Sequence, residues 1–157
     1  MSNQSLELLK NIPWLFDLDR SQLNLLANIA DVITVNAGEK LFAEGDLSKY
    51  FYIVVEGKVD IKIFVPKHDY HTIVVAEPFD MIGWASMTSV VKINAGYAVA
   101  LQATRLISFQ GSQLKHLCDE NHSIGYTIMR RLTNVVASRL ITTRLHLFEM
   151  ILKSDVK

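Results

Sequence analysis

The sequence holds few residues whose chemistry could support catalysis or metal binding. Its five histidines are scattered, and only His68 and His71 lie close together, in a polar stretch typical of a solvated loop. No nucleophile with a nearby base, phosphate-binding glycine loop or pair of carboxylates stands out. The single cysteine, Cys118, is interpreted as a buried structural thiol rather than a redox-active or haem-binding one. We therefore expect neither an enzymatic activity nor a bound metal ion.

A second group of residues could hold a small ligand rather than transform one. Backbone N–H groups at a helix start attract anions, an aromatic ring stacks on a planar molecule, and an amide donates to an anion. Small residues let the backbone approach such a ligand closely. The candidate ligand-binding residues with these properties are Gly83, Trp84, Ala85, Ser86, Asn94, Ala95 and Gly96.

The same residues also allow a purely structural interpretation, which the sequence leaves open. Trp84 then fills an unused pocket as part of the core, and Asn94 is an amide that caps its own loop. The segment Gly83–Ser86 is in that case an ordinary helix start without a ligand.

Three zones with different hydrophobic periods position these residues. Residues 1–30 favour helices, with Asp19 as N-cap and Gln22 three residues later in a capping-box pattern. Residues 31–109 favour many short strands separated by glycine turns, which is typical of a sandwich, roll or barrel. Residues 110–153 favour helices again. The 157 residues are therefore predicted to form one domain, mainly β with flanking helices.

Turn signals give two expectations about strand pairing. The tight turn at Gly57 predicts a hairpin that joins the strand 51–55 to the alternating strand 59–65. The strand 106–109 is expected to pair with the strand 98–101 across the short turn between them.

A long helix is predicted over Ser123–Lys153, and it carries apolar residues on two faces. One face is expected to dock on the β zone and the other to contact a second copy of the chain, giving a homodimer through this helix. Ser112 is the expected N-cap of a shorter helix before it. Four arginines, which we expect to be solvated or to face the dimer partner, recur on the polar side of the long helix: Arg130, Arg131, Arg139 and Arg144.

Charge and composition limit the classes of function. The 16 Lys and Arg residues balance 16 Asp and Glu residues, so the formal net charge is zero. This balance argues against nucleic-acid binding as the main function, because binding a phosphate backbone needs a basic surface. A single cysteine cannot form an internal disulfide, which suits a reducing cytoplasm. Since neither a signal-peptide pattern nor a run of about 18 apolar residues is present, we expect a cytoplasmic protein without membrane contact.

Helices, strands and a long helix in this order resemble the layout of the cyclic nucleotide-binding domain family. The motifs that carry the resemblance are Leu15-Phe16, Gly38–Phe42, Glu44–Asp46 and the run Tyr52–Val59, which is similar to the family's Tyr-Phe-Ile-x-x-Gly-x-Val. The resemblance implies a double-stranded β-helix, a jelly-roll-like β-roll, followed by a long C-terminal helix. It also implies a sensor or regulatory role.

In that family a short helix opens on Gly-Glu, and an Arg follows in a loop of small residues. The Arg binds the cyclic phosphate, and the Glu accepts a hydrogen bond from the ribose 2′-hydroxyl. Here Gly83 matches the Gly, but Trp84 stands at the Glu position and Asn94 at the Arg position. The backbone cradle is thus expected to be retained and both signature side chains to be lost. We expect no tight binding of cyclic AMP or cyclic GMP, and a cyclic nucleotide or another small anion stays the candidate ligand.

Ligand binding in the family moves the long helix relative to the roll. By position alone, the resemblance implies that Thr127, Arg131 and Asn134 close over the pocket. The family's transcription regulators carry a helix-turn-helix after this helix, whereas the sequence ends within a few residues of it. We therefore expect no DNA binding by the chain itself, and an output through an unidentified protein partner.

Three functions remain after this reading of the sequence. The first is a stand-alone, dimeric sensor module of cyclic nucleotide-binding type with a degenerate pocket. The second is a ligand-free dimeric scaffold or protein-interaction domain. The third and most distant is a metal enzyme of the cupin type, a family whose pattern of His-x-His, Glu and a further His is absent here.

Overall fold

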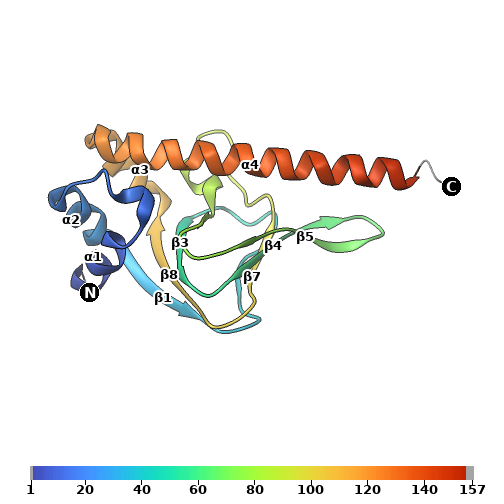
Figure 1. Cartoon of the computed structure of the whole chain (residues 1–157), viewed down its shortest axis with the longest axis horizontal. Coiled ribbons are helices and arrows are strands. Elements are labelled where there is room, and N and C mark those ends of the chain that lie inside the picture. The colour runs from blue at the N-terminus through green and yellow to red at the C-terminus, as the bar shows by residue number, and fades with distance from the viewer. Residues whose placement is uncertain (1, 155–157) are drawn as a thin grey trace.

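Eight short strands lie between helices at the two ends of the chain in the computed structural model, which describes residues 2–154 (Figure 1). This is the mainly β architecture with flanking helices and a long C-terminal helix that the sequence predicts. In chain order the elements are α1 (Ser2–Lys10), η1 (Pro13–Leu15), α2 (Arg20–Asn28), β1 (Ala30–Val35), β2 (Lys40–Phe42), β3 (Tyr50–Glu56), β4 (Val59–Val65), β5 (Asp69–Ala76), β6 (Met81–Ile82), η2 (Trp84–Met87), β7 (Tyr97–Ala100), β8 (Thr104–Gln110), α3 (Gly111–Glu120) and α4 (His122–Ser154).

The strands form two four-stranded antiparallel sheets, one in the order β1-β8-β3-β6 and the other in the order β2-β7-β4-β5. Side chains alternate between the faces of a strand, so each sheet has one inner face. A small core fills the space between the two inner faces, and its buried members are Tyr52, Val54, Val59, Ala76, Ile82, Ala98 and Leu106. The candidate ligand-binding residues lie at the edge of this core.

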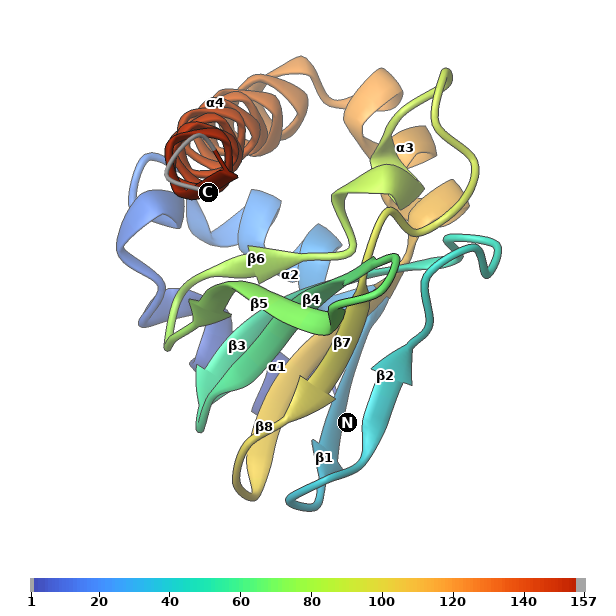
Figure 2. The ribbon, with the colours of Figure 1, turned by 90° about the vertical axis from the view of Figure 1, so that its right-hand side faces the viewer.

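The opposite face of the first sheet packs against the helices. Phe51 and Ile53, which alternate with Tyr52 and Val54 along β3, are fully buried in a larger core with Leu26 of α2, Leu114 of α3 and Ile128 of α4. This core fixes the start of α4 on the β-roll. In Figure 2 that helix is seen end-on, above β5 and β6.

The two predicted strand pairings are wrong, because both turns carry the chain from one sheet to the other. β3 pairs with β6 and β8, whereas β4 pairs with β5 and β7, so the turn at Gly57 is a corner and not a hairpin. The turn between β7 and β8 is the matching corner.

The two corners pack directly on each other. The Lys58 N–H donates to Thr104 Oγ1 at 3.2 Å, and the Leu101 N–H donates to the Lys58 carbonyl at 2.9 Å. A Cβ on Gly57 would lie 2.4 Å from Thr104 Oγ1, and this residue has a φ of +91°. Glycine is therefore required at this corner for two reasons, the backbone conformation and the close approach of the neighbouring corner.

The predicted N-cap is confirmed for α2 but not for α3. The Asp19 and Gln22 capping box is confirmed, with both of its hydrogen bonds at 2.9 Å. The predicted N-cap Ser112 is wrong, because α3 already begins at Gly111, whose N–H donates to the Lys49 carbonyl at 2.8 Å. A Cβ on Gly111 would lie 2.7 Å from the Ser86 carbonyl, so this close packing against η2 decides where α3 begins.

The helix α4 runs along the roll and then continues beyond it, as Figure 1 shows. Its bounds agree within one residue at each end with the predicted helix Ser123–Lys153. No helix among residues 2–154 is both long and apolar enough to span a bilayer.

Candidate ligand-binding cavity

A cavity of about 270 Å³ lies between the roll and α4. Its lining comes from β2, β4, β5, the segment from β6 into η2, the loop before β7, and the middle of α4. The lining residues are Phe42, Ile61, Ile63, Ile73, Ile82, Gly83, Trp84, Ala85, Asn94, Ala95, Gly96, Arg139 and Thr143. Six of the seven candidate residues from the sequence are thus brought together at one cavity.

Gly83 shapes the turn that enters the cavity wall. Its φ of +76° is the left-handed conformation that glycine adopts without strain, and a Cβ there would lie 2.3 Å from the Tyr50 carbonyl. The predicted short helix after it is a single 3-10 turn. Ser86 is the candidate that does not line the cavity, because its buried hydroxyl donates back to the Gly83 carbonyl at 2.8 Å. Ser86 therefore stabilises the turn.

The loop before β7 is held in place by its backbone. The Asn94 N–H donates to the Asp46 carbonyl at 2.8 Å, and the Asn94 carbonyl accepts from the Gly45 N–H at 2.9 Å. Gly96 passes so close to β4 that a Cβ on it would lie 2.8 Å from the Lys62 carbonyl. These contacts place the Asn94 side chain at the cavity, where it is 5% exposed.

Trp84 has two environments at once. Its side chain lines the cavity, and it also packs as a half-buried residue against the larger hydrophobic core. The two interpretations of this residue from the sequence, a ring for ligand stacking and a part of the core, are thus compatible with a single position.

The helix residues at the cavity differ from those that the resemblance implied. Arg139 and Thr143 line the cavity. Arg131 and Asn134 instead border a neighbouring hollow of about 240 Å³, which they share with Arg139. Thr127 is buried nearer the start of α4. The cavity thus meets α4 further along the helix than these residues, and closure over it on ligand binding stays a prediction.

Arg130 and Arg144 are exposed, as expected of solvated charges, whereas Arg131 and Arg139 are half-buried. Arg131 forms an ion pair with Asp80 at 3.4 Å, and its guanidinium lies over the Trp14 ring. Arg130 pairs with Asp17 at 2.7 Å. Only Arg144 is exposed without an ion pair within the described part of the chain.

Arg139 is the charged residue of the cavity lining among residues 2–154. Burial lowers the pKa of its guanidinium, and the nearby carboxylate of Asp80 acts in the opposite direction. An arginine keeps its charge in either case, because its pKa lies far above neutrality.

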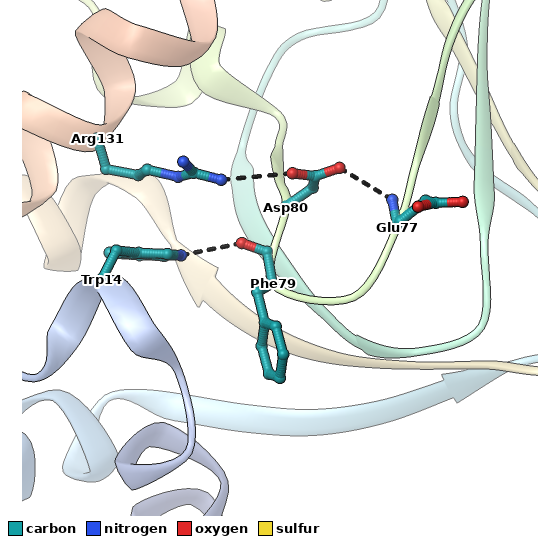
Figure 3. A network of polar contacts seen from close by, with 5 residues as sticks. All are labelled: Trp14, Glu77, Phe79, Asp80 and Arg131. Carbon is teal, nitrogen blue, oxygen red and sulfur yellow. Dashed lines mark hydrogen bonds and ion pairs between the residues drawn. The ribbon is translucent and has the colours of Figure 1, made fainter.

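A polar network joins the chain after β5 to the helices, as Figure 3 shows. Asp80 accepts from the Glu77 N–H at 3.0 Å in addition to its contact with Arg131. Beside it, the Trp14 indole N–H donates to the Phe79 carbonyl at 2.9 Å. The segment that leads into β6 and the cavity wall is therefore tied to α4 and η1 at once.

The sequence analysis expected the long helix at the pocket but missed Arg139 and Thr143, although a signal for them was present. Ile128 and Leu132 of α4 are buried against the core, and Arg139 and Thr143 follow them at helical spacing on the same face. Extending the docking face along the helix would have found both residues.

The other chemistry-bearing residues lie elsewhere. The rings of His68 and His71 are 6.5 Å apart in the β4–β5 hairpin, and no three His, Cys, Asp or Glu residues within 2–154 lie close enough together to hold a metal ion. Cys118 is buried, and this burial raises the pKa of its thiol to about 11.

The cyclic nucleotide-binding domain family matches residues 32–121, more than half of the sequence, and the chain belongs to that family. The family is one of regulatory and sensor domains. This confirms the resemblance that the turn motifs indicate.

Solved structures agree with this assignment. A cyclic nucleotide-binding domain from Methylobacillus flagellatus is similar at 19% identity and a TM-score of 0.77, over 95% of this chain and 83% of that one. The sensor domain of a transcriptional regulator from Pseudomonas aeruginosa is similar at 19% identity and a TM-score of 0.72. This match covers 88% of this chain and 93% of that one. The N-terminal domain of a transcriptional regulator from Streptomyces coelicolor is 26% identical, with a TM-score of 0.66. This match covers 87% of this chain and 94% of that one.

Proposed function

We propose that this domain is a sensor that binds a small molecule in the cavity between its roll and α4. The observation that carries the proposal is the composition of the cavity wall, in which Arg139 and Thr143 of α4 lie across from residues of the roll. A molecule in this cavity contacts both parts. Its binding energy then depends on the position of α4, which is the requirement for a ligand to shift a conformational equilibrium.

We further propose that the cavity does not hold cyclic AMP or cyclic GMP tightly. Asn94 stands where the family has the arginine that binds the cyclic phosphate, and Trp84 stands at the position of the ribose-binding glutamate. A hydrogen bond to a charged group contributes about 1.5–3 kcal/mol, so its loss lowers affinity by roughly one to two orders of magnitude. Both replaced side chains lie at the cavity, which supports a direct effect on the ligand.

The C-terminal half of α4 is the proposed homodimer contact. Large apolar side chains cover this half, and each is about half exposed or more: Leu140, Ile141, Leu145, Leu147, Phe148, Met150, Ile151 and Leu152. Exposed apolar surface of this extent usually marks a protein contact. A second copy of the same helix offers a matching apolar face.

A dimeric scaffold without a ligand is the second candidate, and the same apolar surface of α4 favours it. In that case the cavity has no occupant, and α4 carries the whole function by binding a second copy or an unidentified protein partner. The two candidates differ in one measurable property, which is whether any small molecule stabilises the folded protein.

A thermal-shift screen separates them. The compounds are cyclic AMP, cyclic GMP, cyclic dinucleotides, nucleosides and small organic acids. A ligand at 100 times its Kd stabilises the fold by about 2.7 kcal/mol, which corresponds to a rise in Tm of roughly 5–10 °C. A rise for one compound class supports the sensor, and a flat response to all classes favours the scaffold.

A cavity-filling variant shows whether the responding compound occupies this cavity. Ala95 lines the cavity and is exposed to solvent, so Ala95→Trp narrows the space without disturbing the core. The variant is expected to lose the thermal shift. Ala137→Trp, at an exposed position of α4 that does not line the cavity, is the matched control and is expected to retain it.

A further inference from the structure

Arg139 has a charge without a direct partner in the described part of the chain. The nearby Asp80 carboxylate is engaged by Arg131 at 3.4 Å and by the Glu77 N–H at 3.0 Å. No hydrogen bond or ion pair joins the Arg139 guanidinium to another side chain of residues 2–154. The residue is half-buried beside an apolar cavity. A half-buried guanidinium loses part of its favourable interaction with water. An anion bound in the cavity would replace that interaction.

Asn94 gives a second and independent indication of a ligand. Its side chain is 5% exposed, lines the same cavity, and makes no hydrogen bond within residues 2–154. The Asn94 amide is not one of the fully enclosed polar atoms that lack a partner, so it opens onto the space of the cavity. This side chain is therefore available to hydrogen-bond a polar atom of an occupant.

The rest of the cavity wall limits what that occupant is. Phe42 and the four isoleucines Ile61, Ile63, Ile73 and Ile82 give it an apolar lining. Such a lining disfavours a sugar, whose hydroxyls would lose their hydrogen bonds to water, and it disfavours a second negative charge. One arginine balances one negative charge, and its planar fork matches the two oxygens of a carboxylate.

We propose that the ligand is a small, largely apolar carboxylic acid. Its carboxylate pairs with Arg139, its body lies against the isoleucines and Trp84, and a polar atom of it accepts from or donates to the Asn94 amide. The proposal rests on the proposed sensor function and names the class of ligand for that cavity.

The placement of the charge also has a consequence for signalling. In this cavity the cation comes from α4 and the apolar wall comes from the roll. The two ends of one ligand are therefore held by two different parts of the molecule. A ligand that joins them favours one position of α4 on the roll, with the ion pair to Arg139 as the direct connection.

The test compares a probe acid with its neutral isostere on the full chain. The probes are 2-naphthoate and 2-naphthamide, and binding is measured by calorimetry and by tryptophan fluorescence. The folded protein is expected to bind the acid at least ten times more tightly than the amide. Arg139→Gln is expected to weaken binding of the acid roughly 10- to 100-fold and to leave the amide unchanged. Arg139→Lys keeps the charge but loses the planar fork of the guanidinium. We expect its affinity for the acid to lie between those of the unchanged protein and Arg139→Gln.

A matched control separates the role of Arg139 from a general effect of charge. Arg144 lies on the same helix and is exposed, with its guanidinium over the Phe148 ring. Arg144→Gln removes the same charge away from the cavity, and it is expected to leave binding of both probes unchanged.

Equal affinities for acid and amide, or an unchanged affinity in Arg139→Gln, would overturn the carboxylate assignment. Binding of a nucleoside or cyclic nucleotide together with no response to the acid would overturn it as well, while leaving the sensor function intact. A flat response to every compound would overturn both proposals.

Discussion

Two side chains at the cavity carry the proposed difference in ligand chemistry between this domain and its family. Trp84 and Asn94 occupy the positions of the family's glutamate and arginine, and both line the cavity. The backbone of Asn94 is held by hydrogen bonds to the turn at Gly45 and Asp46. We therefore expect any difference in ligand chemistry to come from these side chains and not from the path of the chain.

This location gives a direct test by restoration. The double variant Trp84→Glu with Asn94→Arg is expected to bind cyclic AMP about 10- to 100-fold more tightly than the unchanged protein, because it regains the charged contact to the cyclic phosphate. Calorimetry measures the affinity, and Asn94→Gln, which adds no charge, is the control. A double variant that keeps its Tm and still fails to bind would show that the backbone cradle no longer fits a cyclic phosphate.

The sequence allowed the roll side of the cavity to be predicted, but not the helix side. The glycines and small residues of the roll occupy turns whose chemistry is local, so Gly83 and Gly96 can be recognised from their neighbours alone. Arg139 and Thr143 reach the cavity because α4 docks on the roll at a particular place. That place is set by the packing of Ile128 on the core, which is a long-range contact. A family pattern carried over by position therefore selected the wrong residues of the helix.

Cys118 gives a prediction about pH. Burial raises the pKa of its thiol from the ordinary 9.0 to about 11. Because the folded protein binds this proton more tightly than the unfolded chain, the contribution to stability is complete below pH 9 and is lost as the pH rises towards 11. The urea midpoint of the unchanged protein is thus expected to fall more steeply between pH 8 and 10.5 than that of Cys118→Ala. If the urea midpoints of the two proteins changed in parallel with pH, the thiol would have the same pKa in the folded and the unfolded chain.

At the scale of elements, the corners show what local turn signals leave undetermined. The glycine at position 57 and the alternating strand after it fit a hairpin as well as they fit a corner. The choice between them depends on the partners of β4, which are β5 and β7 and not β3. The longer strands and the turn positions were therefore predictable, but the two-residue strand β6 was not. Strand pairing depended on the distant segments that compete for each edge.

The corner at Gly57 also predicts a large difference between two glycines of similar backbone conformation. Gly57 and Gly38 have φ values of +91° and +83°, but a Cβ on Gly57 meets Thr104 at 2.4 Å, whereas a Cβ on Gly38 meets nothing within 4 Å. Gly38→Ala is expected to cost about 1 kcal/mol, from backbone strain alone. Gly57→Ala is expected to cost about 3 kcal/mol or more, because the two packed corners must also separate.

Urea unfolding of the two variants measures this difference. Each variant changes one glycine and leaves the rest of the core as it is. We therefore expect the slopes of the two unfolding curves to agree and their midpoints to differ. Equal midpoints for Gly57→Ala and Gly38→Ala would show that the two corners do not pack as tightly as described.

At the scale of the whole molecule, α4 has two different tasks along its length. Its first half is bound to the core through Ile128 and Leu132 and reaches the cavity with Arg139. Its second half passes over the β4–β5 hairpin and ends beyond it (Figure 1), and it exposes its apolar residues. A ligand that favours one position of the first half necessarily reorients the second, since both belong to one continuous helix. We therefore propose that occupancy of the cavity is transmitted to the proposed dimer contact through α4.

The face of α4 that forms this contact follows from helical geometry. Ile141, Leu145, Phe148 and Leu152 are spaced by three or four residues, so they form one stripe. At 100° per residue this stripe lies nearly opposite to Arg139, which faces the roll. We expect the chain to be a dimer at micromolar concentration, with twice the mass of the 17.8 kDa monomer. Leu145→Glu places a charge in the centre of the stripe and is expected to give the monomer, because an unpaired buried carboxylate costs several kcal/mol.

Light scattering measures the mass, and Val90→Glu is the matched control. Val90 is an apolar side chain that is 88% exposed in the loop between η2 and β7 and not part of α4, so its replacement is expected to leave the dimer intact. Leu147→Glu changes the second apolar stripe of the same helix and tests which stripe makes the contact. A monomer in Leu147→Glu together with a dimer in Leu145→Glu would assign the contact to the second stripe, and a monomer in the unchanged protein would refute the dimer itself. Because the stripe with Leu145 lies on the side of α4 opposite Arg139, we expect Leu145→Glu to be the variant that dissociates.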